Sequence, residues 1–461
     1  MTGEHSFSVR GQRVTVVGAA RSGVAAAQLL VRRGASVTLS DVRDRLDDED
    51  ELRNAGVDLE LGGHRESTLT GADLIVTSPG VPLNLPVLEA ARQAGRPVIG
   101  ELELASRWVR GRLVAITGTK GKSTTTTLTG RMLEAGGHRV LVGGNIGHAL
   151  SAQVDDSTED TIHVVEVSSF QLEATDKFHP WLAVLLNFSP DHLDRHASVA
   201  EYAAAKARIF ANQGENDWAV LNAEDAAALN MATGTRARRL LFSMRSSLAE
   251  GIVLEGDEIV RRTEAGDELL VPLSSVRLLG RHLVDDVLAA TTVASLLGVE
   301  AEAITRAVEG FSGLEHALEL VAEVGGVRFV NDSKATNIEA ARRAIEAFDD
   351  RVVLIAGGRF KGGDFRDLLG PLTARHGIVV AIGEARALIR DALGSDVVIH
   401  EAADMSAAVR TAFASAAPGG TVVLAPACAS FDMFRDYAER GRVFKQEVLR
   451  LGEEWNVTRE Q

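Results

Sequence analysis

The sequence predicts an α/β protein of three domains, and two features lead to this expectation. The first is length, because 461 residues at about 150 residues per domain are enough for about three domains. The second is a recurring pattern in which a strand rich in Val, Ile and Leu ends in small residues and leads into a helix. Strands that are apolar throughout are typical of parallel sheets covered by helices on both faces. We therefore expect three successive α/β units.

The first unit, residues 1–108, is expected to be Rossmann-like. A strand over 13–18 leads into the loop GAARSG and then into a helix that Gly34 ends. Further apolar strands are expected at 36–41 and 72–79. The segment 97–108 closes the unit.

The second unit, residues 109–313, is expected to be a P-loop-type domain with a mainly parallel sheet. It opens with a strand over 113–118, a loop of Gly, Lys, Ser and Thr, and a helix. Alternation of apolar and polar residues between about Arg239 and Pro272 indicates an antiparallel patch. A helix over 282–298 and a Gly-containing stretch at 310–313 end the unit. Its other strands are expected in HRVLVGG, TIHVVEVSS, LAVLLNFSP and WAVLN.

The third unit, residues 314–461, is again expected to be Rossmann-like. It begins with two alternating runs around Gly325 and Gly326, which predict a β-hairpin. Strands at 351–358, 377–383 and 421–427 then alternate with helices. Ligands of such sheets bind beyond the carboxyl ends of the strands, and the polar motifs described below follow apolar strands.

Composition excludes several classes of protein. The formal net charge is −15, which disfavours binding to nucleic acid or to anionic membranes. Cys428 is the only cysteine, so neither an intrachain disulfide nor a cysteine zinc site is expected. The N-terminal residues lack an apolar core of signal-peptide length, and no run approaches the roughly 20 apolar residues of a membrane span. We therefore expect a cytoplasmic protein without membrane insertion.

The motif TGTKGKSTTTT, residues 117–127, gives the strongest functional signal. Backbone N–H groups of such a loop can surround phosphate oxygens, while the following helix presents its positive end. Lys122 would then reach the outer phosphates and Ser123 would bind Mg²⁺. Ile116 stands where the full P-loop pattern has Gly. The alternative, a plain Gly/Thr-rich turn, fits less well because a strand precedes the loop and a helix follows it.

The loop GAARSG, residues 18–23, is a second strand-to-helix turn. It is a weak dinucleotide fingerprint because Ala20 replaces the middle Gly of GxGxxG. Asp41 ends the next strand, where a carboxylate could contact a ribose or a base. A tight turn that merely needs small residues explains the loop equally well.

Two further groups in the second unit could serve a magnesium site. Glu166 ends the strand TIHVVE, and a carboxylate there could ligate Mg²⁺ facing the phosphate loop. The segment NFSPDHLDRH, residues 187–196, gathers two aspartates and two histidines, Asp191, His192, Asp194 and His196. Taken alone, this segment would be a polar loop. Lys206, in a helix of small and apolar residues, would taken alone be a surface lysine.

Anion-binding signals recur in the third unit. NDSKATN, residues 331–337, follows a strand and precedes a helix, so its polar side chains could hold an anionic group. AGGRFKGGDF, residues 356–365, adds a Gly-rich turn with Lys361. In APACASFD, Cys428 is expected to be a small packed residue, with Ser430 and Phe431 the more functional neighbours.

Taken together, these motifs resemble the Mur ligases of bacterial peptidoglycan synthesis over nearly the whole chain. The motifs that carry the resemblance occur in the family's order. They are GAARSG with Asp41, SPG (78–80), TGTKGKST, GGNIG (143–147), EVSSFQLE, DHLDRH, NDSKATN, GGRFKGGDF and ACASFD. The pair NDSKATN and ACASFD is typical of the members that add D-glutamate.

The resemblance implies a UDP-binding domain, an ATPase domain, and a third domain that contributes to the amino-acid and ATP sites. ATP would phosphorylate the alanyl carboxylate of UDP-N-acetylmuramoyl-L-alanine, and the amine of D-glutamate would attack the acyl phosphate. ATP and two Mg²⁺ are the implied cofactors, together with a carbamate on Lys206. The expected partners are these small molecules, with no nucleic acid, and we expect a monomer.

The same resemblance implies roles for individual residues. For catalysis they are Lys122, Glu166, His192, Lys206, His316, Asp332 and Lys334. For ATP they are Gly118, Thr119, Lys120, Gly121, Lys122, Ser123, Thr124, Asp286 and Asp332. For the UDP substrate they are Gly18, Ala19, Arg21, Ser22, Gly23, Asp41, Arg43, Ser78, Pro79, Gly80 and Asn145. For D-glutamate they are Thr336, Lys361, Ser430 and Phe431, and for metal they are Ser123, Glu166, His192 and Lys206.

The chain departs from the family pattern at three places. Lys120 stands where Asn is frequent, which adds positive charge near the phosphates. Leu283 and Asp286 replace Asn residues of a motif that contacts adenine. Ala317 follows His316 where the family has arginine, a residue expected to meet the γ-phosphate.

Other functions fit parts of the sequence. Another Mur-type or folylpolyglutamate-type amide ligase would share the architecture and differ in its amino acid. A nicotinamide-dependent oxidoreductase could use GAARSG, but it explains neither TGTKGKST nor NDSKATN. A non-catalytic nucleotide-binding protein is the alternative that Ala317 favours.

Overall fold

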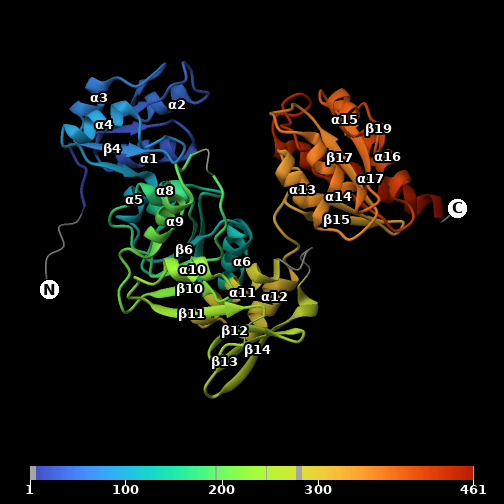
Figure 1. The fold of residues 1–461 in the computed structure, drawn as a ribbon. Coiled ribbons are helices and arrows are strands. Elements are labelled where there is room, and N and C mark those ends of the chain that lie inside the picture. The colour runs from blue at the N-terminus through green and yellow to red at the C-terminus, as the bar shows by residue number, and fades with distance from the viewer. Residues whose placement is uncertain (1–6, 193–194, 246, 277–282, 460–461) are drawn as a thin grey trace. The chain divides into compact units, whose positions relative to one another are not determined.

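The computed structural model describes residues 7–192, 195–245, 247–276 and 283–459 (Figure 1). Its α/β chain divides into two compact units, Met1–Val276 with Val284–Gly310 and Arg277–Leu283 with Phe311–Gln461. It contains three sheets, of which two belong to the first unit. The predicted boundary after residue 108 falls inside the first unit, between helix α5 (Glu101–Ser106) and strand β6 (Arg112–Thr117). The three predicted domain ranges therefore stay a prediction.

The first sheet has five parallel strands in the order β3-β2-β1-β4-β5. The strands predicted at 13–18, 36–41 and 72–79 are confirmed. The short strand β3 was not predicted, because only the first and last of its four residues are buried and two of them are acidic. The elements are β1 (Arg13–Val17), α1 (Arg21–Arg32), β2 (Ser36–Ser40), α2 (Glu49–Asn54), β3 (Val57–Glu60), α3 (Glu66–Gly71), β4 (Leu74–Thr77), α4 (Pro86–Gln93), β5 (Val98–Gly100) and α5.

The second sheet has nine strands in the order β14-β13-β12-β11-β10-β9-β6-β8-β7. The strands β7, β8, β6, β9, β10 and β11 are parallel to their neighbours. The antiparallel patch predicted from about Arg239 to Pro272 is confirmed for β12-β13-β14 (Figure 1) but wrong for its first part, because β11 pairs parallel with both β10 and β12. Its strands are β6, β7 (Arg139–Gly144), β8 (Thr161–Glu166), β9 (Leu182–Leu185), β10 (Trp218–Asn222), β11 (Arg238–Ser243), β12 (Gly251–Glu255), β13 (Glu258–Thr263) and β14 (Gly266–Pro272). Its helices are α6 (Lys122–Ala135), α7 (Leu150–Gln153), η1 (Val154–Asp156), α8 (Ser169–Glu173), α9 (Val199–Ala207), η2 (Arg208–Phe210), α10 (Ala226–Met231), η3 (Leu273–Ser275), α11 (Leu283–Leu296) and α12 (Ala301–Glu309).

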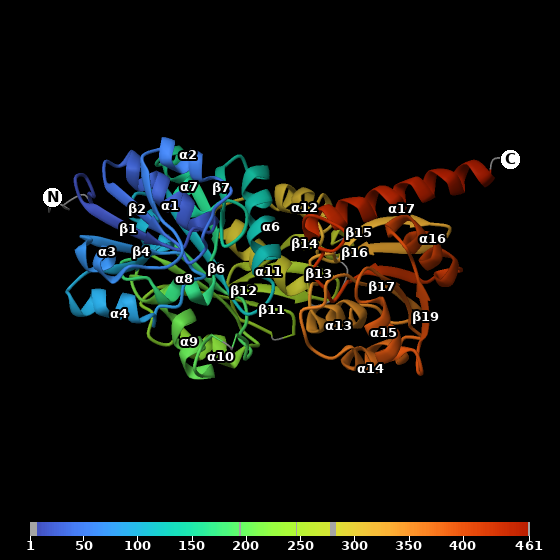
Figure 2. The same cartoon turned by 90° about the horizontal axis from the view of Figure 1, so that it is seen from above.

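The third sheet has six strands in the order β15-β16-β20-β17-β18-β19. The predicted hairpin is confirmed, since β15 and β16 pair antiparallel, while the remaining neighbours are parallel. Helix α17 packs along the hairpin (Figure 2). The elements are β15 (Glu319–Val324), β16 (Val327–Asn331), α13 (Ile338–Glu346), β17 (Val352–Gly357), η4 (Phe365–Leu368), α14 (Leu369–Thr373), β18 (Ile378–Ile382), α15 (Arg386–Leu393), β19 (Val398–Glu401), α16 (Met405–Ala416), β20 (Thr421–Leu424) and α17 (Tyr437–Arg459).

The cores of the third sheet explain why its strands β17, β18 and β20 are mostly apolar. Val353 and Ile355 belong to one buried cluster, while their neighbours Val352 and Leu354 belong to another. Successive side chains of a strand point to opposite faces, so helices cover both faces of the sheet. Because both faces are covered, the polar loops lie at the ends of the strands. Among the described residues, no helix is long and apolar enough to cross a membrane.

Candidate active site

The loop between β6 and α6 is held in a conformation that requires glycine. Gly118 and Gly121 adopt φ angles of 159° and 80°. A Cβ atom on Gly121 would lie 2.0 Å from Oδ1 of Asp286, so no larger residue fits there. The ammonium of Lys122 donates to the carbonyls of Gly118 (3.0 Å) and Thr119 (2.9 Å). The positive charge of Lys122, which is expected to bind the phosphates, therefore lies beside the loop that would hold them.

Asn187 and Tyr202 support this loop, although sequence reasoning gave neither a role. Oδ1 of Asn187 accepts from the backbone N–H groups of Thr119 (3.1 Å) and Lys120 (2.9 Å). The hydroxyl of Thr119 lies 3.3 Å from that of Tyr202. The motif at 187–196 was recognised, but nothing in its spacing distinguished Asn187 as a support for another loop.

Asp286 lies beneath the phosphate loop as a buried carboxyl group. Burial and the neighbouring Asp285 raise its pKa well above the usual range, while the charge of Lys122 opposes the shift. Asp286, predicted to belong to the ATP site, therefore packs against the phosphate loop at Gly121. Of the other predicted ATP residues, Ser123 and Thr124 lie in the first turn of α6.

Glu166, at the end of β8, joins two other predicted residues. Its Oε2 accepts from the hydroxyl of Ser123 at 2.6 Å, and its Oε1 accepts from the amide of Asn145 at 2.7 Å. Strands β6 and β8 pair in parallel, which brings the loop after each of them to one edge of the sheet. A carboxylate and a hydroxyl oxygen at this edge are the ligand types that Mg²⁺ prefers.

Lys206 is buried against the same loop. Its side chain is among the largest fully buried ones, with the residue 1% exposed, so the surface-lysine interpretation is wrong. Nζ donates to the carbonyl of Gly118 at 2.7 Å and lies 4.8 Å from the ring centre of Tyr202. Burial, helped by the charge of Lys122, lowers its pKa to about 7. A substantial fraction of neutral, nucleophilic amine is therefore present near neutral pH.

The segment at 187–196 packs around aromatic rings. His192 adopts φ of 54°, and its ring lies 5.2 Å from that of Phe170. His196 is buried and contacts Ser169 (3.0 Å) and Glu173 (2.9 Å), whereas Asp194 lies outside the described residues. No group of three or more His, Cys, Asp or Glu in the described chain could hold a metal. The metal set of Ser123, Glu166, His192 and Lys206 stays a prediction.

Asp41 organises the loop GAARSG. Its Oδ2 accepts from the N–H of Ala19 at 2.6 Å, and its Oδ1 accepts from Nε of Arg43 at 2.9 Å. Burial would raise the pKa of Asp41, but the hydrogen bonds with Arg43 and Ala19 outweigh it and lower the pKa to about 2. A Cβ atom on Gly23 would lie 1.8 Å from the carbonyl oxygen of Gly18. The small residues therefore permit a close turn, with an ionised carboxylate bound to it.

Two cavities adjoin this loop and are lined by most of the residues predicted for the UDP substrate, though not by Gly18, Gly23 or Asp41. A cavity of about 170 Å³ is lined by GAARSG, the SPG motif and the GGNIG motif. The predicted residues in it are Arg21, Ser22, Ser78, Pro79, Gly80 and Asn145. A neighbouring cavity of about 680 Å³ is lined by Ala19, Arg21 and Arg43, together with Gln28 and His148, which the sequence did not single out.

Arg195 was also missed. Its guanidinium donates to the carbonyls of Gly80 (3.2 Å) and Val81 (2.9 Å), and it lies 4.8 Å from the ring centre of Phe170. It therefore ties the segment at 187–196 to the SPG motif. The signal available in the sequence was only its place within DHLDRH.

In the second compact unit, the three motif loops are bound to one another. The N–H of Ala427 donates to the carbonyl of Ala335 (2.9 Å), and Arg359 and Ala429 exchange backbone hydrogen bonds. Nζ of Lys361 lies 3.2 Å from the hydroxyl of Thr336. Two of the four residues predicted for D-glutamate are thus in contact. Of the others, Ser430 is buried and Phe431 is 64% exposed.

Asp332 and His316 lie at the base of these loops. Burial raises the pKa of Asp332 to about 7, against a hydrogen bond from the N–H of Leu318 and the charge of Lys334. His316 adopts φ of 65° and lies 2.9 Å from the amide of Asn331 through Nδ1. The N–H of Lys334 donates to the carbonyl of His316 at 3.0 Å.

Arg440 of α17 has no signal in the sequence, yet it joins two of the motifs. Although 1% exposed, its guanidinium donates to Oγ (2.9 Å) and the carbonyl (2.8 Å) of Ser333 and to the carbonyl of Cys428 (3.1 Å). Cys428 is buried as predicted, and burial raises the pKa of its thiol to about 12. A thiol held in that form is no nucleophile.

Family models match three consecutive stretches of the chain. They are "Mur ligase MurD-like, N-terminal domain" over residues 12–100, "Mur ligase middle domain" over 116–294 and "Mur ligase, glutamate ligase domain" over 318–428. The matches follow the order of the motifs. Among solved structures, a UDP-N-acetylmuramate-alanine ligase from Thermotoga maritima has a TM-score of 0.58 at 18% identity, covering 95% of this chain and 99% of that one. A pseudomurein peptide ligase type C from Methanothermus fervidus has a TM-score of 0.56 at 18% identity, covering 96% and 100%.

Curated relatives match at higher identity. Proteins named UDP-N-acetylmuramoylalanine--D-glutamate ligase are 49% identical in Acidobacterium capsulatum, covering 96% of this chain and 97% of that protein, and 44% identical in Pelotomaculum thermopropionicum, covering 95% and 98%. A third, from Geobacter metallireducens, is 45% identical and covers 97% and 99%. With such identity over nearly the full length, the chain belongs to the Mur ligase family.

Proposed function

We propose that this chain is an ATP-dependent amide ligase that adds D-glutamate to UDP-N-acetylmuramoyl-L-alanine, a step of cytoplasmic peptidoglycan precursor synthesis. The observation that carries the proposal is the set of Lys122, Ser123, Glu166, Asn145 and Lys206 at one sheet edge. We infer the substrate from the curated relatives, because they align with nearly the full length of the chain and all carry the same name.

In the first step, the alanyl carboxylate attacks the γ-phosphorus of ATP. An acyl phosphate forms and the bond to ADP breaks. Phosphoryl transfer depends on positioning and charge neutralisation rather than covalent help. The loop N–H groups that Asn187 does not occupy and the ammonium of Lys122 can contact the phosphates, and the glycine conformations at residues 118 and 121 keep these donors in place.

The donor set at Glu166 fits Mg²⁺. Glu166 would hold one ion with the hydroxyl of Ser123, and His192 with a carbamate on Lys206 would hold the second. Bound there, Mg²⁺ would neutralise charge that develops on the transferred phosphoryl group. The low pKa of Lys206 supports the carbamate, because only a neutral amine adds to CO₂.

In the second step, the amine of D-glutamate attacks the acyl carbon, and a tetrahedral intermediate collapses to an amide and phosphate. Lys361, Thr336 and Ser430 are the groups proposed to hold the two carboxylates, with the backbone of Phe431. Asp332, with its pKa near 7, can accept a proton from the ammonium of D-glutamate near neutral pH, which frees the lone pair of the amine for the attack.

The UDP group is proposed to bind beside GAARSG. The cavities of about 680 and 170 Å³ extend from Arg43 to Asn145, which suits a long substrate whose reactive end must approach Glu166. We further propose that the enzyme acts as a monomer in the cytoplasm.

The decisive experiment measures phosphate release from ATP with UDP-N-acetylmuramoyl-L-alanine and either D- or L-glutamate. Release with D-glutamate alone supports the proposal. Equal release with L-glutamate would point to another amide ligase of the same architecture. No release with either isomer, from a folded chain that binds ATP, would favour the non-catalytic interpretation.

A further inference from the structure

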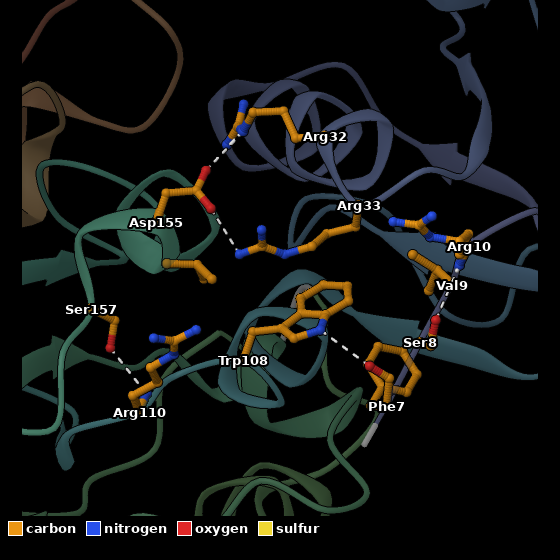
Figure 3. A pocket seen from close by; sticks show the side chains of 11 residues that line it. Phe7, Ser8, Val9, Arg10, Arg32, Arg33, Trp108, Arg110, Asp155 and Ser157 are labelled. Atoms are coloured by element: carbon orange, nitrogen blue, oxygen red, sulfur yellow. Dashed lines mark hydrogen bonds and ion pairs between the residues drawn. The ribbon is translucent and has the colours of Figure 1, made fainter. Parts of the chain in front are cut away.

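A third cavity lies in the first compact unit, and none of the residues proposed for the reaction lines it. Its volume is about 580 Å³. It is formed by residues 7–10 before β1, the C-terminal end of α1, the connection between α5 and β6, and η1 with Ser157 (Figure 3). A volume in this range is typical of sites for small molecules.

The cavity is strongly cationic in a chain of net charge −15. Four arginines line it, Arg10, Arg32, Arg33 and Arg110, and Asp155 is the one acidic residue among the lining residues. Both oxygens of Asp155 are already used, one by Nε of Arg32 at 2.8 Å and the other by a terminal nitrogen of Arg33 at 2.7 Å. The lining therefore has an excess of three positive charges.

The guanidinium groups of Arg10 and Arg110 can bind a ligand. Arg110 bonds through its backbone N–H to Ser157 (3.0 Å), and Arg10 through its backbone N–H to Ser8 (3.4 Å). Within the described parts of the chain, no carboxylate pairs with either guanidinium. Arginine is the side chain best suited to phosphate, because its planar fork donates two parallel hydrogen bonds.

An aromatic wall fixes the cavity's shape. The indole N–H of Trp108 donates to the carbonyl of Phe7 at 3.2 Å, and the two rings lie 5.0 Å apart. The guanidinium of Arg33 lies 5.5 Å from the ring centre of Trp108. Figure 3 shows Arg33 and Arg110 extending from different elements around this opening. The guanidinium of Arg33, held by Trp108 and Asp155, loses little freedom when a ligand binds.

We propose that this arginine cavity is a binding site for an oligophosphate, either a nucleoside polyphosphate or an inorganic polyphosphate. Three excess charges exceed what one carboxylate would need, and the volume exceeds that of one phosphate group. The site is separate from the phosphate loop and does not depend on the proposed reaction.

The test uses isothermal titration calorimetry with sodium tripolyphosphate in magnesium-free buffer. The wild-type chain is compared with K122A, which weakens the binding of tripolyphosphate at the phosphate loop. It is also compared with the triple variant that carries K122A, R10S and R110S. We expect tripolyphosphate to bind K122A, and the dissociation constant to rise at least tenfold when R10S and R110S are added. The matched control adds R236S and R306S, two exposed arginines outside the cavity, and should change the constant less than twofold.

The source of the oligophosphate is resolved by repeating the titration with GTP. Tighter binding of GTP, removed by R10S and R110S, assigns the site to a nucleotide, and equal affinity assigns it to inorganic polyphosphate. The proposal is overturned if K122A no longer binds tripolyphosphate, if R10S and R110S leave affinity unchanged, or if the control pair weakens binding equally. Melting temperatures of all variants verify folding.

Discussion

The buried guanidinium of Arg440 gives the sharpest prediction for the second compact unit. We predict that R440M loosens the loops NDSKATN and ACASFD together. Arg440 donates to three acceptors on Ser333 and Cys428, and it is 1% exposed. Methionine fills similar volume without any donor, so two buried carbonyls lose their partner.

The magnitude follows from these contacts. Each buried carbonyl left without a donor costs about 1–3 kcal/mol. Removing the arginine also relieves the cost of burying its charge, which lowers its own pKa to about 10. We therefore expect the local stability of the two loops to fall by about 2–4 kcal/mol. R440K should restore part of the loss, because an ammonium donates but cannot span both loops with a planar fork.

Hydrogen–deuterium exchange of peptides covering residues 331–337 and 427–431 measures the effect. Exchange in both should accelerate in R440M, and the KM for D-glutamate should rise more than the KM for the UDP substrate. R435M is the control, because the side chain of Arg435 is 81% exposed and pairs with nearby Glu439. Unchanged exchange in R440M, or equal changes in R435M, would refute this account.

Three further predictions concern the phosphate loop and its surroundings. G121A should lower ATP-dependent phosphate release at least a hundredfold in a steady-state assay, because its Cβ would lie 2.0 Å from Asp286 at φ of 80°; near-normal turnover would contradict the packing argument. Burial holds the pKa of Lys206 near 7, below the 10.5 that is usual for lysine, so the unfolded chain binds more protons between these values and stability should rise with pH across this window. K206M should abolish that part of the slope in urea unfolding at pH 7 to 10, and an unchanged slope would exclude Lys206 as its source. A317R should lower the KM for ATP or raise turnover, since a charge-assisted contact contributes about 1.5–3 kcal/mol; unchanged values for both would show that position 317 is unimportant here.

Much of the site could be predicted from the sequence, because the groups of a phosphate loop come from one short segment of the chain. A loop between a strand and a helix places its own N–H groups, so TGTKGKST predicts its function without knowledge of distant residues. Parallel pairing then brings the loops after β6 and β8 together, which is why Glu166 could be expected near Ser123. The remaining roles were inferred from the family resemblance. Among them, the assignment of the metal ligands stays a prediction.

The local pattern failed where burial depends on neighbours that are distant in sequence. Lys206 lies in a helix of small residues that reads as a surface helix as easily as a buried one, and only the packed structure shows its contact with Gly118. Glu103 was given no role from the sequence, and only the packed structure shows that its Oε2 accepts from the backbone N–H groups of residues 176–178.

The sequence by itself determined the α/β class, the order of the loops and the chemistry of the glycine-rich turns, because these depend on residues close together in the chain. The tertiary structure decided which side chains support those loops, as with Asn187 beneath Thr119 and Arg440 beneath Ser333. It also decided that four arginines share one cavity. Such contacts join residues up to 107 positions apart, and their free energy comes from desolvation and geometry that no local pattern encodes.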